Sequence, residues 1–251
     1  MVRVFLLAIA FCAGQCVAAE TSARTYAVLS LVGDRLMVAA PQVDARQPSS
    51  RDAFIDLPGG VLDSAAAIAI QDAMHEADPD STTVLLRARG PEFFKMQADV
   101  LYQVGGSLDL YRLLRPRLGD LPATHLVLVE KIQQAPTRMF SAVTCRSGWN
   151  ACSGRLEGIG VYLGRGAETR DSEGNVVEGF LAPFAYVRLA LFDLRKGELL
   201  AEEVVTKSRI FPSPPDKDPS ETLTQEEKLV QMREVLISGV RAAIPRLIQQ
   251  R

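Results

Sequence analysis

Apolar side chains recur with two different periods along the chain, which predicts a mixture of helices and strands. Apolar residues at intervals of three and four indicate amphipathic helices, whereas alternating or continuous apolar runs indicate strands. The helical spacing is found at 61–77, 91–104, 107–118 and 224–250. The strand patterns are found at 25–32, 35–40, 53–55, 82–88, 125–132, 156–163, 185–194 and 198–208.

Short turn sequences between these strands predict β-hairpins. Gly33 and Asp34 separate 25–32 from 35–40, and a glycine at the first position suits a two-residue turn with positive φ. A second turn, at residues 195–197, joins the next pair of strong strand patterns. The predicted hairpins alternate with helices, and the last predicted element is a long C-terminal helix. We therefore expect an α+β fold. Its sheet should be mainly antiparallel or mixed, built from hairpins, with helices packed on it.

Three glycines lie within or directly after the predicted strand at 156–163: Gly158, Gly160 and Gly164. Their letters resemble a nucleotide-binding glycine loop, but the spacing is wrong and no helix follows directly. Glycines within a strand are more typical of a bulge or of close contact with a neighbouring backbone. We therefore predict a packing role for them.

The beginning of the chain has the three-part pattern of a secretory signal peptide. Arg3 precedes an apolar run at 4–13, and small residues occupy 17–19. The run is too short to cross a bilayer, which needs about 20 residues. We expect residues 1–19 to be a leader cleaved between Ala19 and Glu20; the alternative is an N-terminal core helix. Export to the periplasm or secretion follows from the first interpretation.

Two cysteines in this segment raise the possibility of a lipid anchor. Cys12 and Cys16 follow large residues, whereas a lipidated cysteine needs a small residue before it, so export without a lipid is favoured. The remaining residues, 20–251, are expected to form a single α+β domain. Possible sub-halves are 20–120 and 121–251.

The mature chain would keep two cysteines, Cys145 and Cys152, between predicted strands at 140–144 and 156–163. In an oxidising compartment two such residues are expected to form a disulfide bond; unpaired thiols and a metal or nucleophilic role are the alternatives. Trp149 lies between the cysteines. It either folds back on the sheet or serves as a contact anchor for a partner.

Charge and motif content narrow the possible chemistry. Lys and Arg number 28 against 30 Asp and Glu, which gives no electrostatic reason to expect nucleic-acid binding. The sequence has no P-loop, no Gly-x-Ser-x-Gly and no His-Glu-x-x-His motif. We therefore expect no catalytic residues, no cofactor and no metal. A remaining alternative is an unrecognised hydrolase that uses Asp34 or Glu130 with His125.

Two segments resemble the periplasmic α/β module of the TolB amino-terminal domain and of curli-secretion-type envelope accessory proteins. They are the strand at 126–130 and the longer strand at 186–192 with its turn from Asp193 to Glu198. The resemblance covers residues 124–250, and the lipidation cysteine of the lipoprotein members is missing. It implies a non-catalytic role in the cell envelope through protein contacts.

These observations predict an exported, non-enzymatic envelope protein that acts through protein–protein contacts, with another envelope protein as its partner. A small-ligand-binding protein with its cleft between the two sheet-rich halves is the main alternative.

Overall fold

The computed structural model describes residues 24–33, 35–40, 53–57, 60–101, 106–135, 155–165, 167–214 and 216–249. The helices are α1 (Val61–Ala77), α2 (Pro91–Leu101), α3 (Ser107–Leu118), η4 (Pro219–Glu221) and α4 (Gln225–Gln249). The first six strands are β1 (Thr25–Ser30), β2 (Arg35–Ala39), β3 (Ala53–Asp56), β4 (Thr82–Leu86), β5 (His125–Lys131) and β6 (Gln133–Gln134). The others are β7 (Leu156–Leu163), β8 (Glu168–Arg170), β9 (Val176–Glu178), β10 (Phe180–Asp193), β11 (Glu198–Ser208) and β12 (Phe211–Pro212).

One ten-stranded mixed sheet organises the molecule, and the predicted α+β class is confirmed. Its central path is β3-β2-β7-β10-β5-β1-β4, and β11 pairs with β10 as the predicted hairpin. The strands β5, β1 and β4 are parallel to one another, whereas β10 runs antiparallel to β5, β7 and β11. The sheet therefore joins a parallel βαβ-type part to an antiparallel part.

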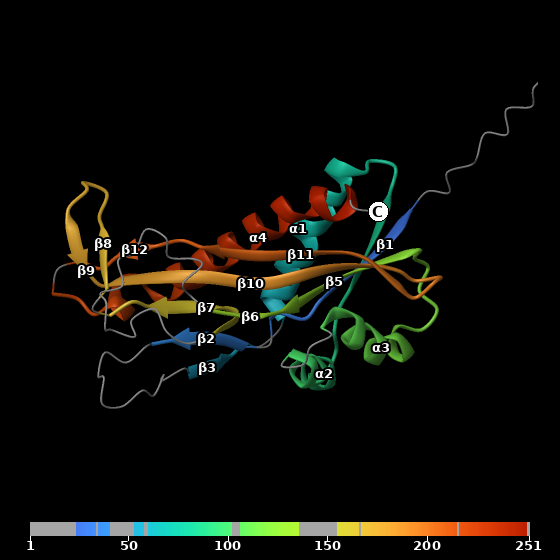
Figure 1. Ribbon diagram of the computed structural model, residues 1–251, viewed down its shortest axis with the longest axis horizontal. Coiled ribbons are helices and arrows are strands. Elements are labelled where there is room, and N and C mark those ends of the chain that lie inside the picture. Colours follow the sequence, from blue (N-terminus) through green and yellow to red (C-terminus); the bar gives the residue numbers. More distant parts are fainter. Residues whose placement is uncertain are drawn as a thin grey trace, which may run out of the picture.

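Helices cover both faces of this sheet. Figure 1 shows α4 running along β10 and β11, while α2 and α3 lie together near β5. Side chains of β10 alternate between two cores, as its period of two requires. Val187, Leu189 and Leu191 pack with α1 and α4, whereas Ala190 and Phe192 pack with α2 and α3.

The predicted hairpin between 25–32 and 35–40 is wrong. Both edges of β1 are occupied by parallel neighbours, β4 on one side and β5 on the other. The strand β2 pairs instead with β3 and β7. A strand has only two edges for pairing, and both edges of β1 are taken by strands distant in sequence. The local turn signal at Gly33 therefore does not produce a hairpin with β2. The continuous apolar run of β1 is the pattern of a strand buried on both faces of a parallel sheet.

The C-terminal helix begins at a capping box formed by Thr224 and Glu227. The Thr224 backbone N–H donates to Glu227 Oε2 at 2.7 Å, and the Glu227 backbone N–H donates to Thr224 Oγ1 at 3.2 Å. Each side chain thus satisfies a backbone donor that the first turn would leave without a partner. Helix α4 then packs its apolar side against β10 and β11.

Candidate functional site

The candidate site is a pocket of about 850 Å³ at the carboxyl ends of β1 and β4. The amino-terminal turns of α1 and α2 complete its walls. Ligands of α/β proteins are typically held at such places, because strand ends and helix amino termini converge there. The described lining comprises Ser30, Gly33, Leu57, Gly60, Asp63, Ser64, Ala67, Ile68, Leu85, Leu86, Arg87, Ala88, Arg89, Gly90, Pro91 and Phe94.

Asp63, in the first turn of α1, fixes the shape of this pocket. Its Oδ1 accepts hydrogen bonds from Ser30 Oγ at 2.7 Å, from the Val32 N–H at 2.8 Å and from the Gly33 N–H at 3.2 Å. Burial raises the pKa of the Asp63 carboxyl, against the lowering effect of these donors. The carboxylate therefore holds the chain as it leaves β1, and this contact directs it away from a hairpin.

The rest of the pocket is largely apolar. The two serine hydroxyls of the described lining are both engaged, Ser30 with Asp63 and Ser64 with the Gly60 carbonyl at 3.0 Å. Arg87 and Arg89 lie at the exposed end of β4 and bring positive charge to the rim. Apolar walls with a few fixed polar groups suit binding of an apolar group beside an acidic one.

Large apolar side chains stay exposed around the pocket. Val61 and Ile68 on α1 and Leu85 on β4 have exposed fractions of 64%, 51% and 40%. Strand β4 ends the path of the sheet, so its outer edge pairs with no strand in the described part of the chain. An exposed apolar patch beside an open edge is typical of an interaction surface.

Gln97 of α2 bridges the carboxyl ends of β1 and β5. Its Nε2 donates to the Leu31 carbonyl at 2.6 Å, and its Oε1 accepts from the Lys131 N–H at 2.7 Å. The side chain is 3% exposed. The ends of β1 and β5 are therefore joined by a side chain, whereas the described pocket lies on the β4 side of β1.

A buried polar network lies beyond Gln97, where β5 meets β10. Ser107 Oγ donates to the buried Glu130 carboxylate, and Arg188 Nη1 lies 3.4 Å from Glu130 Oε1 and 3.6 Å from Glu202 Oε1. Burial raises the pKa of Glu130, partly offset by Ser107 and Arg188. The network ties the start of α3 to three strands, β5, β10 and β11.

Glu157 of β7 is a second buried carboxylate, and its pKa is shifted in the opposite direction to that of Glu130. Its Oε1 accepts from Arg35 Nη2 at 2.8 Å, and its Oε2 accepts from Gln133 Nε2 at 3.1 Å. Burial acts to raise its pKa, but these hydrogen bonds, with the charges of Arg35 and Lys131, leave the pKa below its ordinary value. Glu157 is therefore a stable anion that joins β2, β6 and β7.

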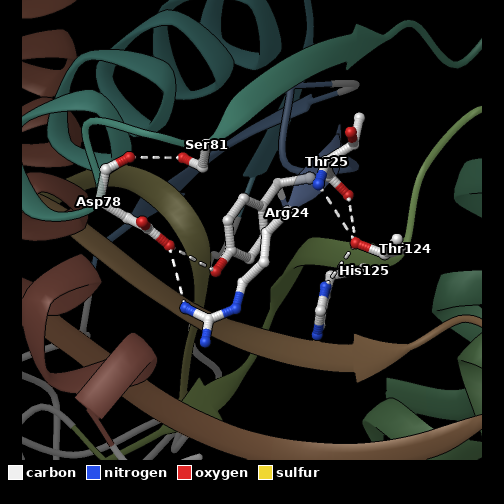
Figure 2. Close-up of polar contacts among 7 residues, drawn as sticks. Arg24, Thr25, Asp78, Ser81, Thr124 and His125 are labelled. Carbon is white, nitrogen blue, oxygen red and sulfur yellow. Dashed lines mark hydrogen bonds and ion pairs between the residues drawn. The ribbon is translucent and has the colours of Figure 1, made fainter. Parts of the chain in front are cut away.

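His125 lies at the other end of β5, among contacts that fasten the starts of the parallel strands (Figure 2). Its Nδ1 is 2.8 Å from Thr124 Oγ1, which also donates to the Thr25 carbonyl at 3.1 Å. The ring packs on Tyr26 with centroids 5.2 Å apart. Asp78 accepts from Tyr26 Oη and from Arg24 Nη1, each at 3.2 Å. His125 is thus a half-buried residue at the edge of the core.

The structure does not bring Glu130 and His125, one of the two predicted hydrolase combinations, together. Glu130 and His125 are five positions apart on β5, so they lie at opposite ends and on opposite faces of the strand. Asp34 lies outside the described residues. Among the described residues, no group of three His, Cys, Asp or Glu side chains could hold a metal ion.

The other predicted site residues fall on parts of the chain that are not described. These are Ala19, Glu20, Cys145, Trp149 and Cys152. The leader, the disulfide bond and the contact anchor therefore remain predictions. Sequence reasoning missed Asp63 and Gln97, whose partners are about thirty or more positions away along the chain.

No protein-family model and no curated protein matches the chain. Solved structures are similar at low identity. They include a PelC dodecamer from Paraburkholderia phytofirmans (8% identity, TM-score 0.30, 90% of this chain and 87% of that chain). Protein CT253 from Chlamydia trachomatis is another (14% identity, TM-score 0.35, 91% of this chain and 99% of that chain). A third is XCC0632 from Xanthomonas campestris, described as DUF330 (8% identity, TM-score 0.35, 90% of this chain and 84% of that chain). None of these three is a TolB or curli-secretion protein.

Proposed function

We propose that this is an exported, non-enzymatic protein of the cell envelope that binds another protein at the pocket beside β4. One observation carries the proposal: a mostly apolar pocket opens next to a sheet edge that no described strand pairs, where Val61, Ile68 and Leu85 remain exposed. Leaving such side chains in water is unfavourable, and a partner that covers them gains about 25 cal/mol for each Å² of apolar surface buried.

The shape of this surface favours an extended segment of the partner. A strand added to the outer edge of β4 would satisfy the backbone groups that no described strand pairs. Alternate side chains of that strand would then point toward the pocket, where an apolar one contacts Ile68 and Leu85. An acidic residue near it would pair with Arg89 at the rim. The partner is therefore expected to present an apolar strand with a carboxylate beside it.

The proposed compartment rests on the predicted leader at residues 1–19. No helix in the described residues combines the length and the apolar character needed to span a bilayer.

A photo-crosslinking amino acid at position 85 tests this function in cells of the source organism. We expect a specific protein adduct from position 85. Position 204 on β11 is the matched control, because Val204 is similarly exposed, at 46%, but lies far from the pocket in the strand order. An adduct pattern that is the same at both positions, or the absence of any adduct at position 85, would contradict the proposal.

The substitution Ile68→Glu should weaken binding of the captured partner. We expect a loss of about 30-fold in affinity, the factor for an interface hot spot worth about 2 kcal/mol. Since Ile68 is half-exposed in the free protein, the melting temperature should change little. Calorimetric titration measures the first quantity and thermal denaturation the second. Unchanged affinity would show that the pocket is not the contact surface.

A further inference from the structure

A second pocket, of about 620 Å³, lies at the other end of the parallel strands. It is formed by the C-terminal half of α3, the segment leading into β5 and the turn between β10 and β11. Its described lining includes Tyr111, Arg115, Asp120, Leu121, Leu194 and Arg195. Nothing in the function proposed above uses this pocket.

Tyr111 gives this pocket an unusual feature. The residue is 1% exposed, and its ring stacks on Phe192 with centroids 4.4 Å apart and an interplanar angle of 14°. Its hydroxyl is buried and has no hydrogen-bond partner in the described structure. Buried polar atoms are nearly always paired, because an unmet donor costs the desolvation of that group. Because Tyr111 lines the pocket, a ligand that shifts the side chains covering this hydroxyl can supply the missing acceptor.

Two arginines reach the same pocket from different elements. Arg115 comes from α3 and Arg195 from the β10–β11 turn, and neither guanidinium pairs with a side chain among the described residues. Gly197, with φ +72°, lets Arg115 approach this turn closely: a Cβ atom there would lie 2.9 Å from Arg115 Nη1. Asp120 also lines the pocket, so the charge of these three side chains is +1.

The turn itself is held by Asp193. Its Oδ1 accepts from the backbone N–H groups of Arg195 at 2.8 Å and Lys196 at 2.9 Å. These bonds lower the pKa of Asp193, together with the Lys196 and His125 charges. Arg195 is thus presented by a rigid turn.

We propose that this pocket binds a phosphate-bearing molecule. Guanidinium groups donate in a planar fork that matches phosphate oxygens, and two of them compensate its negative charge. The Tyr111 hydroxyl would donate to a ligand oxygen, while Leu121 and Leu194 contact the body of the ligand. The volume falls in the range of small-molecule sites, so an organic phosphate fits better than the inorganic ion.

Calorimetric titration of the full protein tests this site with four probes: inorganic phosphate, glycerol 3-phosphate, phosphatidylglycerol vesicles and phosphatidylcholine vesicles. We expect glycerol 3-phosphate or the phosphatidylglycerol vesicles to bind, and phosphatidylcholine vesicles not to bind. Binding of the soluble phosphate alone identifies a free metabolite, and binding of the anionic vesicles alone identifies a lipid headgroup. Both outcomes support the site; if none of the probes binds, the proposal is overturned.

Three variants connect the binding to these residues. Arg115→Gln, Arg195→Gln and Tyr111→Phe should each weaken binding about tenfold, as expected for the loss of one hydrogen bond to a charged group. Unliganded Tyr111→Phe should melt at or above the temperature of the unaltered protein, because the unpaired hydroxyl is removed and the ring stays.

Arg112→Gln is the matched control. Arg112 lies on the same helix but outside the described lining of the pocket, and its guanidinium pairs with Asp109 at 3.1 Å. Its removal should leave the affinity unchanged. An equal loss in Arg112→Gln and Arg115→Gln would show unspecific attraction to a basic surface and would overturn the proposal.

Discussion

Replacing Gly160 with alanine is expected to lower the free energy of unfolding by about 3 kcal/mol, the upper range for overpacking a core. A Cβ atom at this position would lie far inside contact distance of the Met37 carbonyl oxygen, and 2.9 Å from Phe184 Cζ. Gly160 is on β7, which β2 and β10 flank on either side, so the backbone has little room to move. Chemical denaturation measures the loss.

Gly174→Ala is the comparison that isolates this clash. Gly174 has φ +86°, and a Cβ atom there would meet nothing within 4 Å. The strain of a positive φ should cost this variant about 1 kcal/mol. Both substitutions restrict the unfolded chain in the same way, so the difference between their losses, plus the strain cost at Gly174, reports the packing at Gly160. A loss at Gly160 no larger than that at Gly174 would show that β2 and β7 move apart at little cost, contrary to the prediction.

The role of the glycines on β7 and directly after it could be predicted from the sequence, because the pattern indicates close approach without identifying the partner. Gly158 has φ +62° and lies against the aliphatic part of Lys131, while the ring of Phe180 covers Gly164. Both observations confirm the predicted packing role. Helices α1 and α3 were also predicted residue for residue, since proline and glycine mark their ends and the apolar spacing is regular.

Pairing between strands could not be predicted in the same way. The Gly33 turn signal is local, but β1 pairs with β4 and β5, which start about 57 and 100 positions later. One sequence contains no direct record of which distant strands meet. The candidate site could not be predicted for the same reason. Asp63 has its role through hydrogen bonds with Ser30 and Val32, and Gln97 through hydrogen bonds with Leu31 and Lys131, all of which are distant in sequence.

The prediction for Arg188 follows from the charge it compensates. Its guanidinium lies near the carboxylates of Glu130 and Glu202, and the Glu130 side chain is 6% exposed. We expect Arg188→Met to lower the free energy of unfolding near pH 7 by about 3 kcal/mol, because a buried carboxylate is left without its partner. Arg241→Met is the control. It breaks an exposed ion pair with Glu76, which should cost less than about 1 kcal/mol.

The dependence on pH distinguishes this electrostatic cause from a loss of packing. Burial already raises the pKa of Glu130 above its ordinary value of 4.5, so the folded protein holds this proton more firmly than the unfolded chain does. The contribution of Glu130 to stability is therefore greatest below pH 4.5 and falls as the pH rises from there toward the folded-state pKa. Without Arg188 that pKa rises further, so the penalty in Arg188→Met should be much smaller near pH 4 than near pH 7. Adding Glu130→Gln should restore most of the loss near pH 7, because the amide carries no charge. If the penalty were the same at both pH values and Glu130→Gln gave no rescue, Arg188 would act through its packing and not through its charge.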